Sequence, residues 1–257
     1  MKNYRFIALL LVISVSLFAQ GVPEEVAASA ASRPALIVAS TSWTAAFADL
    51  AGLDDVPFIA PANLIHPPEY EIVVSDVLKI NHADYFIYAG YERMMQSMGS
   101  SIKKEAASLL KINTNNSIEN VSEQAGIIAS LMGTQDESQK RVAHYRQTIK
   151  AGAEKVRQEE LDQLKVYCHA MQAFLAKDLG LSIAGTFGPG PVTAAQIAEV
   201  AKGGYDLIID NIHNPIAKPF MEVSPATKLV VWRNFPERGG RNSLNEMVKA
   251  NIEQLFE

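Results

Sequence analysis

Three side chains have the chemical types and the placement to bind a divalent metal ion. His66 precedes two prolines, which we expect to hold the chain extended and to present the imidazole from a stiff loop. His169 directly follows an apolar run, and Asp210 ends another. Neutral imidazoles and carboxylates are ligands of zinc, manganese and related ions. A single loop histidine is commonly structural, so the hypothesis depends on whether the fold brings these residues to one place.

Apolar, partly β-branched runs alternate with helical patterns along most of the chain, which predicts an α/β fold with parallel sheets. In such folds ligands gather at the carboxyl ends of the strands, where His169 and Asp210 are expected. The expected strands are residues 35–39, 56–59, 84–88, 166–168, 182–186, 207–209 and 229–231. The expected helices are residues 41–50, 75–81, 94–110, 121–132, 135–164, 171–179, 194–202 and 243–256.

The order of these elements predicts two α/β lobes joined by one long helix. Residues 34–132 form the expected N-terminal lobe, residues 133–164 the connecting helix and residues 165–257 the C-terminal lobe. The helical pattern at residues 135–164 contains no proline, and at 1.5 Å per residue it would run roughly 40 Å. We therefore expect the ligand crevice to lie between two lobes whose relative motion the helix limits.

The first residues have the pattern of an export signal. Lys2 and Arg5 precede an apolar run at residues 6–18, so residues 1–20 are predicted to be a signal peptide and residues 21–33 a flexible leader. The single cysteine, Cys168, argues against a lipid-modified N-terminal cysteine and against an intramolecular disulfide. A soluble periplasmic protein that is not a lipoprotein is the expected product.

Composition narrows the range of partners. The formal net charge is −5, and the sequence has no block of lysine and arginine. Nucleic acid and anionic membrane surfaces, which attract basic patches, are therefore not expected as partners. With 48% hydrophobic residues the chain can build ordinary cores, and we expect a monomer.

The candidate residues lie in segments that resemble a known family. Residues 66–71 (HPPEYE), the pair Ser75-Asp76 and residues 83–90 (ADYFIYAG) are similar to the signature of zinc/manganese solute-binding proteins of ABC transporters, the ZnuA/TroA-like group. Residues 169–181 resemble that group's His-x-Ala-Phe-x-Tyr-x-Ala-x-x-Tyr-Gly-Leu segment. The resemblance implies a metal held in the inter-lobe crevice by His66 and His169 and delivered to a membrane permease. It implies no enzymatic activity and no organic cofactor.

The sequence departs from this family at two of its four usual ligands. A second histidine is expected near residues 112–116, whose polar side chains are only Asn and Thr. The final carboxylate is expected just after the last core strand, where Arg233 is nearest. An arginine cannot bind a cation, so Asp210, and then His213, are the nearest groups to complete a metal site.

Three hypotheses follow. In the first, the crevice takes a divalent transition metal, of the zinc or manganese class, through His66 and His169 with Asp210. In the second, the same fold binds an anion or a metal chelate through Arg233, whose guanidinium suits anions. In the third, His66, His169 and Asp210 hold a metal with an open position for hydrolysis. The third ranks lowest because no positioned nucleophile or base accompanies the histidines.

Overall fold

The computed structural model describes residues 35–98 and 101–257. The predicted signal peptide at residues 1–20 and the leader at residues 21–33 lie outside this part. The described chain contains two parallel sheets. We use N-terminal lobe for the elements from β1 to α4 and C-terminal lobe for those from β4 to the end.

The N-terminal lobe has a three-stranded parallel sheet in the order β1-β2-β3. Val38 pairs with Phe86, and Phe86 pairs with Leu109 on the other side. The strands are β1 (Ile37–Ala39), β2 (Tyr85–Tyr88) and β3 (Leu109–Lys111), and the helices are α1 (Ser42–Leu50), α2 (Val74–His82), α3 (Arg93–Met98) and α4 (Ile118–Met132).

Two expectations for this lobe are wrong. The helix predicted at residues 94–110 is only α3, and the segment ends in the strand β3. Leu109 and Leu110 pair with β2, and this sheet pairing overrides a weak local preference for helix. The strand expected at residues 56–59 is a single parallel bridge between Phe58 and Ala39, next to Pro57, which has no N–H to extend the ladder.

The C-terminal lobe has a four-stranded parallel sheet in the order β5-β4-β6-β7, with β4 and β6 at its centre. His169 is the last residue of β4, and Asp210 lies near the end of β6, as the apolar runs predicted. The strands are β4 (Val166–His169), β5 (Ile183–Phe187), β6 (Leu207–Asn211) and β7 (Lys228–Trp232), and the helices are α6 (Ala173–Asp178), α7 (Ala194–Gly203), α8 (Lys218–Val223) and α9 (Ser243–Glu253). The sequence pattern did not predict α8.

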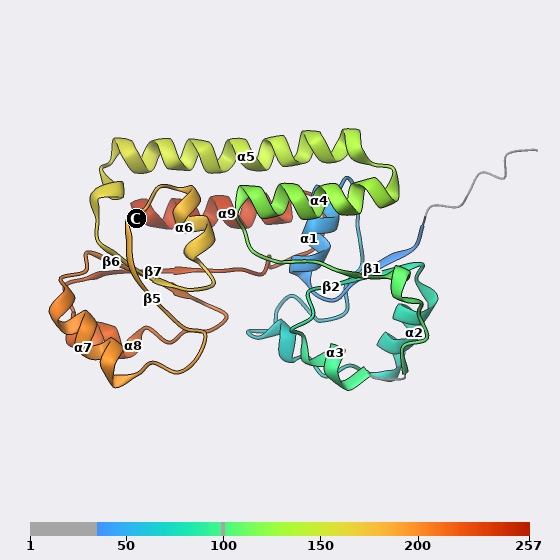
Figure 1. Cartoon of the computed structure of the whole chain (residues 1–257), viewed down its shortest axis with the longest axis horizontal. Coiled ribbons are helices and arrows are strands. Elements are labelled where there is room, and N and C mark those ends of the chain that lie inside the picture. Colours follow the sequence, from blue (N-terminus) through green and yellow to red (C-terminus); the bar gives the residue numbers. More distant parts are fainter. Residues whose placement is uncertain (1–34, 99–100) are drawn as a thin grey trace, which may run out of the picture. The chain divides into compact units, whose positions relative to one another are not determined.

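One long helix, α5 (Gln135–Gln158), connects the lobes and packs along both α4 and α9 (Figure 1). Its 24 residues correspond to about 36 Å, and a short 3₁₀ helix at Leu161–Gln163 takes the place of its expected last turns. Near its start, Arg141 donates to the carboxylates of Asp49, Asp54 and Glu137. The expected architecture of two parallel-sheet lobes and one connecting helix is therefore confirmed.

The main hydrophobic core runs through both lobes. It includes Trp43 and Phe47 from α1 and also Trp232 and Leu244 from the C-terminal lobe. The Trp43 and Phe235 rings meet edge to face, with centroids 5.0 Å apart. Cys168 is buried in the same core, and burial raises the pKa of its thiol to about 12, as expected for a small buried apolar residue. Among the helices described here, none is long and apolar enough to cross a bilayer.

The packing of α5 against α9 gives a test of this shared core. A Cβ at Gly152 would lie 2.9 Å from Cδ1 of Ile252 and 3.0 Å from Cδ2 of Leu179, whereas a Cβ at Gly126 of α4 would meet nothing within 4 Å. Gly152→Val should lower the free energy of unfolding by about 1–3 kcal/mol through overpacking. Gly126→Val should leave it nearly unchanged, since valine in a helix is no worse than glycine. Urea denaturation measures both, and equal effects would contradict the close approach of α5 to α9.

Candidate functional site

His66 lies on the loop that leaves the N-terminal sheet. Its side chain is exposed, and the following residues form a 3₁₀ helix, Pro67–Glu69, in which Glu69 N–H donates to the His66 carbonyl. The expectation of an extended chain after His66 is therefore wrong. Prolines have a fixed φ that fits the first positions of a helix, where their missing N–H is not needed. The loop is still stiff, and His66 is the residue that precedes its helical turn.

His169 is completely buried at the carboxyl end of β4, and both of its ring nitrogens have partners. Nδ1 accepts the Met171 N–H at 3.2 Å, so Nε2 carries the proton and donates to Oδ1 of Asn214 at 2.9 Å. Gly188 lies directly against this nitrogen, because a Cβ there would be 2.4 Å from Nε2. Burial lowers the pKa of His169, so the ring is neutral at pH 7.

Asp210 is buried beside His169 and stabilises the loop between β6 and α8. Its carboxylate accepts the backbone N–H of Ala217 at 2.9 Å and that of Ile216 at 3.4 Å, just before α8. Its charge raises the pKa of His169, although burial has the larger, opposite effect. Within the described part of the chain, Asp210 therefore lies close to one of its two predicted partners.

The loop of His66 contacts the opposite lobe at a different residue, His213, through the carbonyl of Ile65. His213 is buried, donates from Nδ1 to the Ile65 carbonyl at 2.8 Å, and accepts the Phe235 N–H on Nε2 at 3.4 Å. Burial lowers the pKa of His213, and the charges of Arg233 and His66 lower it further, against the hydrogen bond to Ile65. The ring is thus a neutral bridge between the two lobes.

The structure therefore brings His169 and Asp210 close together, whereas the loop of His66 meets the C-terminal lobe at His213. No group of three or more His, Cys, Asp or Glu side chains placed to hold a metal ion occurs among residues 35–98 and 101–257. The roles of His66, His169 and Asp210 as metal ligands stay predictions. In the geometry described, His169 would have to exchange its bond to Asn214 for a metal.

A small cavity of about 330 Å³ opens between the lobes beside His213. Residues 62–65 line it from the N-terminal lobe, and Ile212, His213, Arg233 and Glu237 line it from the C-terminal lobe. An Nη atom of Arg233 lies 2.9 Å from a carboxylate oxygen of Glu237. The sequence reasoning placed Arg233 in the crevice, and the structure puts it on the wall of this cavity.

In residues 112–116, where a second histidine was expected, polar side chains form hydrogen bonds within the protein. Asn116 accepts the Trp43 indole N–H at 2.8 Å, and Thr114 shares a hydrogen bond of 2.9 Å with the Tyr91 hydroxyl. On the other lobe, Asn234 accepts the Gln172 amide at 2.6 Å. Asn116 and Asn234 are thus each paired with a neighbour, one in each of the two segments where the sequence resemblance implies a further metal ligand.

Sequence reasoning missed one buried carboxyl group next to the crevice, that of Glu92. It is fully buried and accepts three hydrogen bonds, from the Ser40 hydroxyl at 2.5 Å and from the N–H groups of Ala89 and Gly90 at 2.8 and 2.6 Å. These donors come from the carboxyl ends of β1 and β2, so Glu92 fixes the loops that leave both strands. The one sequence feature that could have indicated this role is an acidic residue two positions after Gly90, just beyond the end of a strand.

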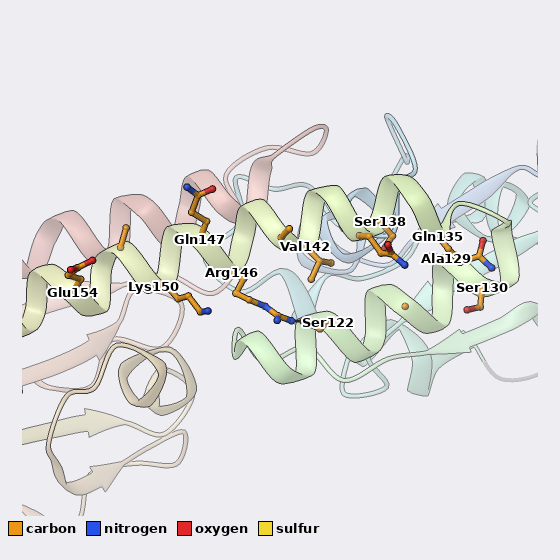
Figure 2. A pocket seen from close by; sticks show the side chains of 14 residues that line it. Ser122, Ala129, Ser130, Gln135, Ser138, Val142, Arg146, Gln147, Lys150 and Glu154 are labelled. Carbon is orange, nitrogen blue, oxygen red and sulfur yellow. Dashed lines mark hydrogen bonds between the residues drawn. The ribbon is translucent and has the colours of Figure 1, made fainter.

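A larger cavity, of about 830 Å³, lies outside the crevice between α4 and α5 (Figure 2). Small or polar side chains line most of it, and Arg146 crosses toward Ser122 with a hydrogen bond of 3.2 Å (Figure 2). No histidine lines this cavity, and its lining comes from α4 and α5 rather than from the ends of the strands. The inter-lobe crevice is therefore the better candidate site.

Comparison with known proteins supports the fold. No protein-family model matches the sequence, and no curated protein sequence matches it. Three similar solved structures are the laminin-binding protein Lmb of Streptococcus agalactiae, described as having adhesin and metal transporting activity, the solute-binding protein FpvC of P. aeruginosa with Ni²⁺, and the Mn-bound periplasmic metal-binding protein of Candidatus Liberibacter asiaticus.

These likenesses extend over most of both chains. The TM-scores are 0.64, 0.63 and 0.58, and the sequence identities are 18%, 17% and 12%, in the same order. Between 85% and 86% of this chain and between 95% and 97% of the other chains are covered. The chain has the fold of metal-binding solute-binding proteins. The fold that the sequence resemblance implied is confirmed.

The buried histidines predict a pH dependence of stability. His213 has a lowered pKa in the folded chain, so below pH 6.5 the unfolded chain takes up a proton that the folded chain does not. The free energy of unfolding should therefore fall between pH 7 and pH 5. His213→Gln should flatten this slope by up to about 1.4 kcal/mol per pH unit, because an amide keeps both hydrogen bonds without titrating.

Urea denaturation at several pH values between 5 and 8 measures the slope. His82→Gln, at an exposed position at the end of α2, controls for the loss of a histidine as such. A slope that is the same in His213→Gln and in the unchanged protein would contradict the buried, neutral bridge.

Proposed function

We propose that this protein is an extracytoplasmic solute-binding protein that captures a divalent transition metal and delivers it to the permease of an ABC transporter. The main support for this proposal is the fold, which is similar to that of metal-binding solute-binding proteins over nearly their whole length. The HPPEYE segment and the segment beginning at His169 support the same function by their sequence resemblance. We further propose that the protein is a periplasmic monomer, and we assign it no catalytic step.

The proposed ligands are His66 and His169, with Asp210 as a third. Both His169 and Asp210 are held at the carboxyl ends of central strands, and the lowered pKa of His169 keeps its ring neutral, as a metal ligand must be. His66 comes from the opposite lobe on an exposed loop that can approach a metal. Binding would exchange the His169 to Asn214 hydrogen bond for a metal bond.

Metal titration tests the proposal directly. Calorimetry with Mn²⁺ and Zn²⁺ on protein stripped by a chelator should show binding, and the double variant His66→Ala with His169→Ala should lose it by at least about 100-fold, since two ligands are removed. Asp210→Asn should weaken binding about tenfold if this carboxylate ligates the metal. His82→Ala should leave binding unchanged.

Circular dichroism should confirm that each variant is folded before the titrations are compared. No heat with either metal, or the same affinity in the double variant, would overturn the metal function.

A further inference from the structure

We propose that the cavity between the lobes is a carboxylate subsite, in which Arg233 holds an organic acid that accompanies the metal. This inference rests on the proposed function and names the form in which the metal enters. The metal would arrive as a chelate with a small carboxylate ligand. The site is distinct from the pair formed by His169 and Asp210, because its lining includes neither residue.

Arg233 is preorganised at this place. Its backbone N–H donates to Oδ1 of Asn251 at 3.1 Å, and its carbonyl accepts Nδ2 of Asn251 at 2.9 Å. Asn251 is fully buried in α9, so the backbone of Arg233 is clamped to a helix while its side chain is 26% exposed at the cavity. The clamp fixes the point from which the side chain extends, the guanidinium is paired with Glu237, and its planar donors match two carboxylate oxygens.

Arg233 can exchange its present ion-pair partner for a ligand. Its partner in the cavity, Glu237, is 74% exposed, and ion pairs of this kind contribute little to stability. Glu237 also shows that the guanidinium accommodates a carboxylate oxygen at 2.9 Å. A ligand carboxylate can therefore replace Glu237 without leaving a buried charge unpaired, since Glu237 would remain in water.

The walls of the cavity favour an organic anion over an inorganic one. Ile65 and Ile212 both line it, one from each lobe, and their side chains are 66% and 39% exposed. A volume of about 330 Å³ exceeds the needs of a bare metal ion and falls at the lower end of the usual range for small-ligand pockets, ~300–1,000 Å³. A short carbon skeleton that carries carboxylates fits both the apolar walls and the cation.

A chelate also fits the incomplete protein ligand set. The described residues offer no group of three metal-binding side chains, and His169 already has hydrogen-bond partners on both nitrogens. A metal that enters with carboxylate oxygens brings part of its own coordination. Arg233 and Ile65, the residue before the candidate metal ligand His66, line the same cavity, so the cation lies at the part of the crevice where the His66 loop passes.

Calorimetric titration with three probes tests this subsite, namely Mn²⁺ alone, citrate alone and the Mn²⁺–citrate complex. The unchanged protein should bind the complex more tightly than Mn²⁺ alone. Arg233→Ala should weaken binding of the complex about tenfold or more, as expected for the loss of a charge-assisted, two-pronged contact. Glu237→Gln should strengthen it, because the competing carboxylate is removed.

Arg238→Ala is the matched control. Arg238 lies on the same loop, pairs with Glu246 at the surface and is about half exposed, so this change should leave binding of the complex unaltered. Circular dichroism and the Glu237→Gln variant, whose substitution lies at an exposed position, guard against misreading a folding defect as lost binding.

The outcomes separate the subsite from the proposed function. Normal binding of Mn²⁺ alone, with the same affinity for Mn²⁺–citrate in Arg233→Ala and in the unchanged protein, would overturn the subsite and leave the metal function standing. Absence of binding in every titration would overturn both. Citrate that binds alone as tightly as its Mn²⁺ complex, with loss in Arg233→Ala, would support the carboxylate subsite and overturn the chelate.

Discussion

The continuous hydrophobic core that joins both lobes is the constraint on which the crevice depends. Trp43 of α1 packs against Phe235 of the opposite lobe, and α5 approaches α9 so closely that only a glycine fits easily at position 152. Opening the lobes by a wide hinge would expose this core to water, at about 25 cal/mol for each Å² of apolar surface. Ligand entry and release must therefore use small tilts, loop movements and side-chain exchange.

Within this fixed frame, the polar groups of the crevice are hydrogen-bonded to other parts of the protein. His169, Asp210 and His213 all have hydrogen-bond partners, and each of these bonds contributes roughly 0.5–1.5 kcal/mol. Such bonds are strong enough to hold the side chains in one place without a ligand. They are also weak enough to be exchanged when a ligand binds.

The sequence predicted the parts of this site that depend on local pattern. Apolar runs correctly placed His169 and Asp210 at strand ends, since a buried parallel strand has a recognisable composition. The partner of His169 is Asn214, 45 positions away, and only the pairing of β4 with β6 brings the two together. The same limit explains β3, whose three residues are a strand because β2 lies beside them. Contacts that tertiary structure creates leave no trace in a local pattern.

Arginine at position 233 changes what the crevice can hold. A crevice that binds a bare cation gains from carboxylates and loses from a nearby fixed positive charge, which repels the ion. Here the backbone of Arg233 is clamped through Asn251 on one lobe, and the neutral His213 bridges to the loop of His66 on the other. A ligand with both a metal and a negative charge resolves this conflict, because its anionic part satisfies the arginine while its metal remains open to imidazole nitrogen. The two departures from the ligand set that the sequence resemblance implies are then consistent with each other. A chelated metal needs fewer protein ligands, and its chelator needs a cation.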